Sequence, residues 1–351
     1  MGYSIALASP RFIFNDPERF FHSYAFPLLS HTREMLVSIW NMPSYGRRLK
    51  YLEKNGLEFD ITLKSLGHSK KLKAEALVNL NGCHWPSYEV KATRNTDITK
   101  VHHLMDYNFE PVNFADKLAS SGTNYLLGYA DHGKYCNFYK MYFGQLNLPL
   151  LAVPFGVSPR YTCGETDKLL RINKLLGVGA LNPIDDPLAP ANSLVEFTNY
   201  FSSKFSHRFR AEFRQSATQY SMLKDFFPRP PKTKDSNLDI PSLLKKYQFF
   251  LNDPSVLQFP PARTYEGVAC GSIMVAPDNL CFRDIGFSHL NNCIFFSPSD
   301  PKWIQNTLAL LENINDNDKA RIQKNGINWV QNYTGKKLAS NLISELHNAS
   351  T

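Results

Sequence analysis

The stretch PPARTYEGVACGSIMV, residues 260–275, places one carboxylate, Glu266, among small and apolar residues. The two prolines at its start indicate that no helix begins before them, and Thr264 is a suitable N-cap for a short helix that begins at Tyr265. Gly271 can end this helix in a left-handed conformation, and the apolar run SIMVAP then forms a strand. Glu266 is therefore expected in the first helical turn.

Two interpretations of Glu266 are open at this point. The carboxylate can simply complement the helix dipole, with the small residues around it serving packing. Alternatively, the helix N-terminus faces a cleft and attracts phosphate oxygens, while the carboxylate accepts hydrogen bonds from two neighbouring hydroxyls, as on a ribose. Arg263 would then neutralise phosphate charge.

Length, charge and cysteine use limit the class of protein. A chain of 351 residues with 43% apolar composition predicts two domains. It shows no signal peptide and no apolar run of about 18 residues, and its six cysteines lack metal-ligand spacing, so we expect a cytoplasmic protein without a metal site or other cofactor. The formal charge of +8 favours anionic partners, among them nucleotides and an anionic membrane surface contacted peripherally. The basic run at 64–73 lacks interleaved aromatic residues, which argues against nucleic acid.

Apolar runs alternate with segments of helical spacing along the chain, which is typical of parallel sheets covered by helices. In the first half these runs are at 4–9, 35–40, 76–80, 100–105 and 124–130. In the second half they are at 148–157, 174–181, 247–251, 272–277 and 292–297. The proline-rich, charged segment 227–237 is predicted to be a surface loop.

The length and this alternation predict two α/β domains with parallel sheets and a cleft between them. Pro154 breaks an apolar run, so the first domain is placed at 1–153 and the second at 154–332. The remaining residues, 333–351, have the spacing of an amphipathic helix, and the first domain is one place where this helix can pack.

The second half resembles the donor-binding domain of group 1 glycosyltransferases of the GT-B fold. The family pattern R-x-x-E-A-x-A-C-G stands here as Arg263, Glu266, Ala269, Cys270 and Gly271, with glycine where the family has its first alanine. The downstream segments DPKWIQNTLALLEN and INWVQNYT resemble the two terminal helices of the family. Upstream, LLGVGALNP at 175–183 resembles its first strand and phosphate loop.

The resemblance implies a fold of two Rossmann-like domains facing a cleft. It further implies a metal-independent transfer of a sugar from a nucleoside-diphosphate sugar to a hydroxyl of a glycan or lipid-linked acceptor. It also implies a donor site, for which the candidate residues are Gln258, Arg263, Thr264, Tyr265, Glu266, Gly179 and Arg210. Glu266 would bind the ribose, the N–H groups of 264–266 and the arginines would bind the diphosphate, and Gln258 would contact the sugar. Many retaining members carry glutamate where this chain has Gln258, so the resemblance favours retention only slightly.

An inverting enzyme would also need a base from the first domain. Asp131 and His132 follow the predicted strand 124–130, and ligands of open α/β sheets bind beyond the carboxyl ends of strands. The pair His102 and His103 is a second cluster, of which strand alternation would bury one member. Two alternative functions stay open: a non-catalytic relative that binds a nucleotide or glycan, and a sugar-nucleotide epimerase.

Overall fold

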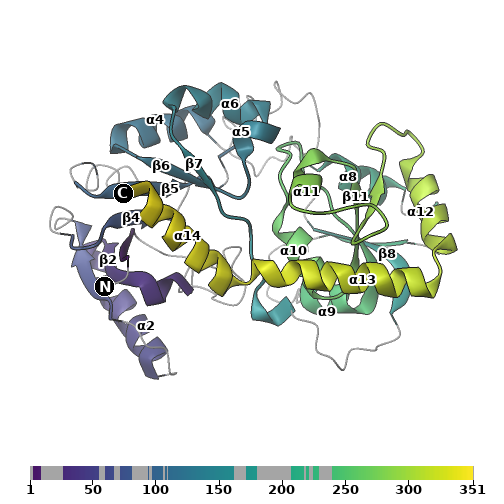
Figure 1. The fold of residues 1–351 in the computed structure, drawn as a ribbon, viewed down its shortest axis with the longest axis horizontal. Coiled ribbons are helices and arrows are strands. Elements are labelled where there is room, and N and C mark those ends of the chain that lie inside the picture. The colour runs from purple at the N-terminus through teal and green to yellow at the C-terminus, as the bar shows by residue number, and fades with distance from the viewer. Residues whose placement is uncertain are drawn as a thin grey trace. The chain divides into compact units, whose positions relative to one another are not determined.

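A computed structural model describes residues 3–8, 27–54, 60–66, 72–80, 94, 97–105, 107–108, 110–161, 171–179, 207–216, 219–220, 224–228 and 239–350. The chain divides into two compact units (Figure 1). Unit 1 contains Met1–Pro154 and Gly335–Thr351, and unit 2 contains Phe155–Thr334. Each unit has a parallel β-sheet with helices packed around it, so the predicted α/β class is confirmed.

The sheet of unit 1 has seven strands in the order β3-β2-β1-β4-β5-β6-β7, and each recorded pairing is parallel. All five apolar runs predicted in the first half form strands here. The strands are β1 (Ile5–Ala8), β2 (Thr32–Val37), β3 (Thr62–Ser65), β4 (Ala76–Asn79), β5 (Thr99–His103), β6 (Tyr125–Gly128) and β7 (Leu150–Ala152). β3 was not predicted, because TLKS at this edge of the sheet is polar and no more than half-buried.

The longest helices of unit 1 are α4, α2 and α14, with 11, 13 and 16 residues. α14 contacts η1, and the hydroxyl of Tyr125 on β6 donates a hydrogen bond of 2.8 Å to the carbonyl of Ala349. The helical elements are η1 (Pro27–His31), η2 (Ile39–Asn41), α2 (Met42–Lys54), α4 (Pro111–Ser121), α5 (His132–Tyr135), α6 (Asn137–Phe143), η5 (Gly144–Leu146) and α14 (Gly335–Ser350).

Both histidines of β5 are buried, so the prediction that alternation would expose one of them is wrong. His102 and His103 are 2% and 0% exposed. β5 lies inside a parallel sheet that is covered on both faces, and alternation then directs side chains to two buried layers instead of one. Burial lowers the pKa of His102 to about 3, with a smaller contribution from the charge of Lys100.

Unit 2 has a five-stranded parallel sheet in the order β12-β11-β10-β8-β9. The apolar runs predicted at 174–181, 247–251, 272–277 and 292–297 all form strands in it. The strands are β8 (Ile172–Gly179), β9 (Lys224–Pro228), β10 (Tyr247–Leu251), β11 (Ile273–Pro277) and β12 (Ile294–Phe296). β9 includes residues 227 and 228, the first two of the predicted proline-rich loop. The rest of that loop, 229–237, lies outside the described residues.

The core of unit 2 lies between this sheet and its helices. Phe213, Phe249 and Trp303 belong to one apolar cluster of buried side chains, to which α8, β10 and α12 contribute. One face of the segment 303–314 packs into the unit, since Trp303, Leu308, Leu311 and Ile314 are all buried. The helical elements are η6 (Pro159–Tyr161), α8 (Arg208–Gln215), α9 (Ile240–Lys246), α10 (Ala262–Ala269), α11 (Leu280–Asp284), α12 (Trp303–Asn313), α13 (Asp316–Val330) and η7 (Gln331–Tyr333).

Candidate functional site

The order of the second sheet creates a topological switch point. Strands β8 and β10 are neighbours, and from them the chain continues to β9 on one side and to β11 on the other. In open α/β sheets, ligands bind beyond the carboxyl ends of the strands at such a point. Gly179 ends β8 there, and Asn252 and Asp253 directly follow β10.

The site contains a close approach between Gly179 and Arg210, which the resemblance had suggested separately. Gly179 has φ +129°, and a Cβ at this position would lie 2.9 Å from the Nη1 atom of Arg210. Only glycine therefore lets the guanidinium lie against the end of β8. Burial lowers the pKa of Arg210 to about 10. The charge of Asp253 raises this pKa, and the charge of Arg263 lowers it further. A cation of this kind is strongly desolvated and suits an anionic ligand.

Asp253 is the buried counterpart of this arginine. Its carboxylate accepts a hydrogen bond of 3.1 Å from the backbone N–H of Arg210 and one of 3.0 Å from that of Ser255. Burial by itself would raise the pKa of Asp253, but the neighbouring His207 and Arg210 outweigh it, so the pKa is lowered. The Nδ1 atom of His207 lies 3.9 Å from Oδ1, which is too long for a hydrogen bond. Burial, followed by the charge of Arg210, lowers the pKa of His207 in turn.

Glu266 lies on α10 and belongs to a second polar group. The Nη1 atom of Arg263 is 3.1 Å from Oε2 of Glu266, but its orientation is not that of a hydrogen bond, so Nη1 keeps donor capacity. Burial and the negative charge of the same carboxylate raise the pKa of Tyr161 on η6. Arg160, whose Nε is buried without a hydrogen-bond partner, has its guanidinium 5.0 Å from the Tyr161 ring centre.

The start of α10 differs from the prediction. The helix begins at Ala262, with Pro261 as its N-cap, because proline has no steric conflict with a helix that follows it and alanine is a strong helix former. Glu266 therefore lies in the second turn. The N–H of Thr264 bonds to the carbonyl of Pro261 at 2.9 Å, so this amide is already used within the helix start. The predicted left-handed end at Gly271 is confirmed, with φ +76°.

Two of the predicted donor-site residues are core residues. Thr264 and Tyr265 are both 0% exposed. The Thr264 hydroxyl accepts a hydrogen bond of 2.8 Å from the side chain of Asn252, and the Tyr265 ring stacks on Trp329 at 5.6 Å between ring centres. Their side chains hold α10 to the rest of unit 2 and are not placed to contact a donor.

Gln258 lies beside the loop that follows β11. It has φ +56°, and its side-chain oxygen accepts a hydrogen bond from Asn279. Its amide nitrogen donates to the carbonyl of Ser255 at 3.3 Å. The side chain is thus held by its neighbours on both sides and presents a neutral polar group.

In unit 1 the two predicted base candidates have different environments. Asp131 is exposed and caps α5 by accepting a 3.1 Å hydrogen bond from the N–H of Lys134. His132 is fully buried, and burial lowers its pKa to about 3. Its Nε2 accepts a hydrogen bond from the N–H of Tyr129 at 3.3 Å. The choice of His132 as a candidate base is therefore corrected, because the chain turns back after β6 and packs this ring over Gly128, away from solvent.

Asp253, His207, Arg160 and Tyr161 were missed by the sequence analysis. Asp253 carried a usable signal, because it directly follows the apolar run 247–251 in a predicted parallel sheet. The other three lie next to loops, and nothing in their sequence context distinguishes them.

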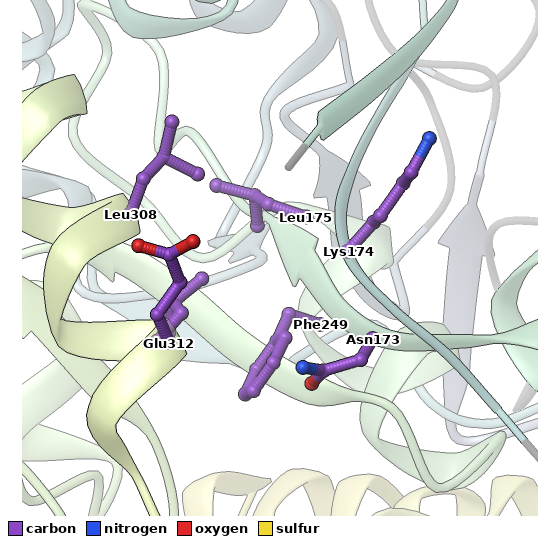
Figure 2. Close-up of a pocket in the computed structure, with 7 residues that line it drawn as sticks. Asn173, Lys174, Leu175, Phe249, Leu308 and Glu312 are labelled. Carbon is purple, nitrogen blue, oxygen red and sulfur yellow. The ribbon is translucent and has the colours of Figure 1, made fainter. Parts of the chain in front are cut away.

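A hollow in unit 2 is lined by residues that do not belong to this site. It is open to solvent, has a volume of about 200 Å³, and is lined by Asn173, Lys174 and Glu312 among others (Figure 2). Asn173 and Lys174 are at the start of β8, whereas Gly179 is at its end. Among the described residues, no three His, Cys, Asp or Glu side chains form a group that could hold a metal ion. None of the helices within those same ranges is long and apolar enough to cross a membrane.

Comparison with known sequences gives no match, either to a protein family or to a curated protein. Comparison with solved structures gives many. A glycosyltransferase from Rickettsia africae ESF-5 has a TM-score of 0.57 at 12% identity, with 99% of this chain and 98% of that chain covered. HepE from Anabaena, in complex with UDP and glucose, has a TM-score of 0.57 at 13% identity, with 99% and 100% covered.

A similar fold also occurs in a solved structure that is not named as a glycosyltransferase. The N-terminal domain of trehalose-6-phosphate phosphatase from Candida albicans has a TM-score of 0.57 at 9% identity, with 100% of this chain and 97% of that chain covered. At these identities the likeness concerns architecture. The chain has a mixed α/β fold of two Rossmann-like units that matches glycosyltransferases of the GT-B type.

Proposed function

We propose that this protein is a glycosyltransferase that moves a sugar from a nucleoside-diphosphate sugar to a hydroxyl of a glycan or lipid-linked acceptor. The observation that carries the proposal is the placement of the buried Arg210 against Gly179 at the switch point of the second sheet. Arg263 is electrostatically coupled to Arg210 and extends the positive charge towards Glu266. A diphosphate needs such cations, because negative charge develops on it as the glycosidic bond breaks.

Each group then has a distinct role. Arg210 and Arg263 hold the diphosphate, with help from the first-turn N–H groups of α10 at Ala262 and Arg263. Glu266, oriented by Arg263 and Tyr161, accepts hydrogen bonds from the ribose hydroxyls. Gln258 donates or accepts a hydrogen bond at a sugar hydroxyl. Compared with the glutamate of many retaining enzymes, it can still bind the sugar but places no charge near the reacting carbon.

The reaction breaks the bond between the sugar C1 and the diphosphate oxygen and forms a bond from C1 to the acceptor oxygen. The bonding electrons leave with the diphosphate, and the arginines stabilise that charge without a metal ion. The acceptor hydroxyl loses its proton to the leaving diphosphate oxygen if the enzyme retains configuration, and to a carboxylate base if it inverts configuration. Asp131 has the exposed carboxylate that such a base requires. HepE has been crystallised with UDP-glucose, so uridine donors are the first ones to test.

A ligand-stability screen tests the donor site. A nucleoside diphosphate at a hundredfold excess over its dissociation constant is expected to stabilise the protein by about 2.7 kcal/mol, which a melting curve detects. Glu266→Ala should remove most of this shift, because the ribose loses its acceptor. The matched control is Glu312→Ala on α12, an exposed glutamate away from the switch point. If no nucleoside diphosphate or nucleotide sugar shifts the melting curve, the proposal fails.

A second experiment isolates Arg210. In the double variant Arg210→Met/Asp253→Asn no buried charge is left unpaired, and we expect the dissociation constant for the nucleoside diphosphate to rise about tenfold to a hundredfold. Asp253→Asn alone keeps the guanidinium and should bind at least as well as the parent. Arg208→Ala removes an exposed cation from the same helix and should have little effect. Equal affinities for the double variant and Asp253→Asn, measured by calorimetry, would contradict this role.

A non-catalytic nucleotide-binding relative is the second candidate function. The burial of His132 favours it, since one of the two candidate bases cannot reach solvent. Incubation with nucleotide sugars separates the possibilities. Release of nucleoside diphosphate that Glu266→Ala abolishes supports the transferase, whereas binding without release supports the second candidate. Conversion of the donor sugar without an acceptor would instead indicate an epimerase.

A further inference from the structure

Gln258 lies in a tight turn after β10 that holds it in a left-handed backbone conformation. Its φ is +56°, and Ser255 in the same turn has φ +61°. The backbone N–H of Gln258 bonds to the carbonyl of Ser255 at 3.3 Å, and the N–H of Ser255 bonds to the carboxylate of Asp253 at 3.0 Å. Left-handed backbone is costly for residues other than glycine, and such strained positions concentrate where side chains bind ligands. The turn therefore restricts where the Gln258 side chain can lie.

The hydrogen-bond chain through the Gln258 side chain has only one possible polarity. At one end, the side-chain oxygen of Asn279 accepts a hydrogen bond of 2.9 Å from the backbone N–H of Cys281, so its amide nitrogen faces Gln258. That nitrogen donates to the oxygen of Gln258, whose own nitrogen donates to the carbonyl of Ser255 at 3.3 Å. A backbone N–H only donates and a carbonyl only accepts, so neither amide can be turned over. A glutamate at 258 would place a carboxylate oxygen against the Ser255 carbonyl, so the turn favours an amide here.

The two amides offer hydrogen-bond donors without negative charge. A primary amide has two N–H groups, and among the described residues Gln258 and Asn279 each use one of them. Both side chains are partly exposed, so a ligand can reach the pair. Asp278, the carboxylate next to Asn279 in sequence, is neutralised by Arg283, whose Nε lies 2.6 Å from Oδ1. The pair therefore suits a group that accepts hydrogen bonds and carries negative charge.

We propose that the sugar bound at Gln258 and Asn279 carries a carboxylate, so that the donor is a nucleoside-diphosphate uronic acid. This assignment rests on the proposed function, in which Gln258 contacts the sugar. The two oxygens of a carboxylate accept the two remaining N–H groups, and hydrogen bonds to a charged acceptor are about twice as strong as those between neutral groups. A glutamate at 258 would repel the same carboxylate. Asn279 then has two roles, since it orients Gln258 and supplies the second donor.

Calorimetry with matched donors tests the assignment. The nucleoside is the one that the melting screen selects, so for uridine the probes are UDP-glucuronate, UDP-glucose and free UDP. We expect the uronate donor to bind about tenfold more tightly than the hexose donor, which differs from it by one carboxylate. Binding of the free diphosphate without this preference would overturn the assignment and leave the proposed function standing. Absence of binding by all three probes would overturn both.

Gln258→Glu introduces the charge that the amide avoids. It should weaken binding of the uronate donor about thirtyfold and change binding of the hexose donor little, so that the preference is reversed. The matched control is Gln305→Glu on α12, which makes the same substitution at an exposed position of unit 2 and should keep the parent preference. A folded Gln258→Glu protein that still prefers the uronate donor would contradict the assignment.

Asn279→Ser separates a positioning role from a merely structural one. Serine keeps an oxygen that can cap α11 at the N–H of Cys281, but it lacks the N–H that holds Gln258. We expect the two donors to bind with affinities that agree within about twofold, while the affinity for the free diphosphate and the melting temperature stay close to those of the parent. Equal weakening of all three probes would show that Asn279 only supports the fold, and an unchanged preference would show that it does not orient Gln258.

Discussion

Acidification from pH 7 to pH 4.5 is expected to remove about 5 kcal/mol of stability from unit 1. His102 and His132 are fully buried there, and burial lowers the pKa of each to about 3. In the unfolded chain a histidine has a pKa of about 6.5. Between about pH 3 and about pH 6.5 these histidines are protonated in the unfolded state but not in the folded state. Stability is therefore complete above about pH 6.5 and falls by about 1.4 kcal/mol per pH unit for each histidine as the pH drops towards 3.

Urea unfolding at a series of pH values measures this slope. His132→Gln should remove about half of it, whatever the substitution does to stability at pH 7, and His102→Gln should do the same. The matched control is His347→Gln, which replaces an exposed histidine of the same unit and should leave the slope intact. A parent slope that persists in His132→Gln would show that the His132 ring is protonated in the folded protein.

Gly267→Ala is expected to destabilise unit 2 by about 2–3 kcal/mol. A Cβ at this position of α10 would lie 2.3 Å from Cζ of Phe250 and 2.6 Å from both Cε atoms. Phe250 is 0% exposed on the central strand β10, so its ring cannot move aside. The gain in helix propensity, about 1 kcal/mol, offsets only part of the cost. Because α10 also carries Arg263 and Glu266, nucleotide binding should weaken as the helix is displaced.

A double-mutant cycle checks the assigned cause. Phe250→Leu removes the ring that the new methyl group would meet, so Gly267→Ala should cost much less in the Phe250→Leu background. Gly326→Ala is the comparison within the same unit, since its Cβ would lie 3.1 Å from a methyl group of Val268 and should cost less. If Gly267→Ala melts like the parent protein, α10 can move away from β10 and the close packing is not essential.

The strands and the class of fold could be predicted from the chain because their signal is local. A strand of a parallel sheet is buried on both faces, so it reads as a continuous apolar run, as at 247–251 and 272–277. The polar edge strand β3 lacks this signal and was missed. The start of α10 was misplaced by three residues, because a proline at the N-cap is compatible with a helix that follows it.

The candidate site depends on contacts between segments that are distant in sequence. Sequence resemblance indicated Gly179, Arg210, Arg263 and Glu266, but it gave equal weight to Thr264 and Tyr265, whose side chains pack into the core. The spacing around Asp131 and His132 likewise could not show that one side chain is exposed and the other buried. The direction of a side chain is decided by what packs against it, and local sequence does not contain that information.

The amino-acid sequence thus determined the strands, the two parallel sheets and the carboxylate on α10, because apolar periodicity and turn residues act over a few positions. Long-range packing decided that the guanidinium of Arg210 lies on Gly179 with Asp253 beside it, and that Tyr161 meets Glu266. These contacts join loops at the carboxyl ends of different strands. They exist only after the sheet has assembled and burial has determined which charges must be paired.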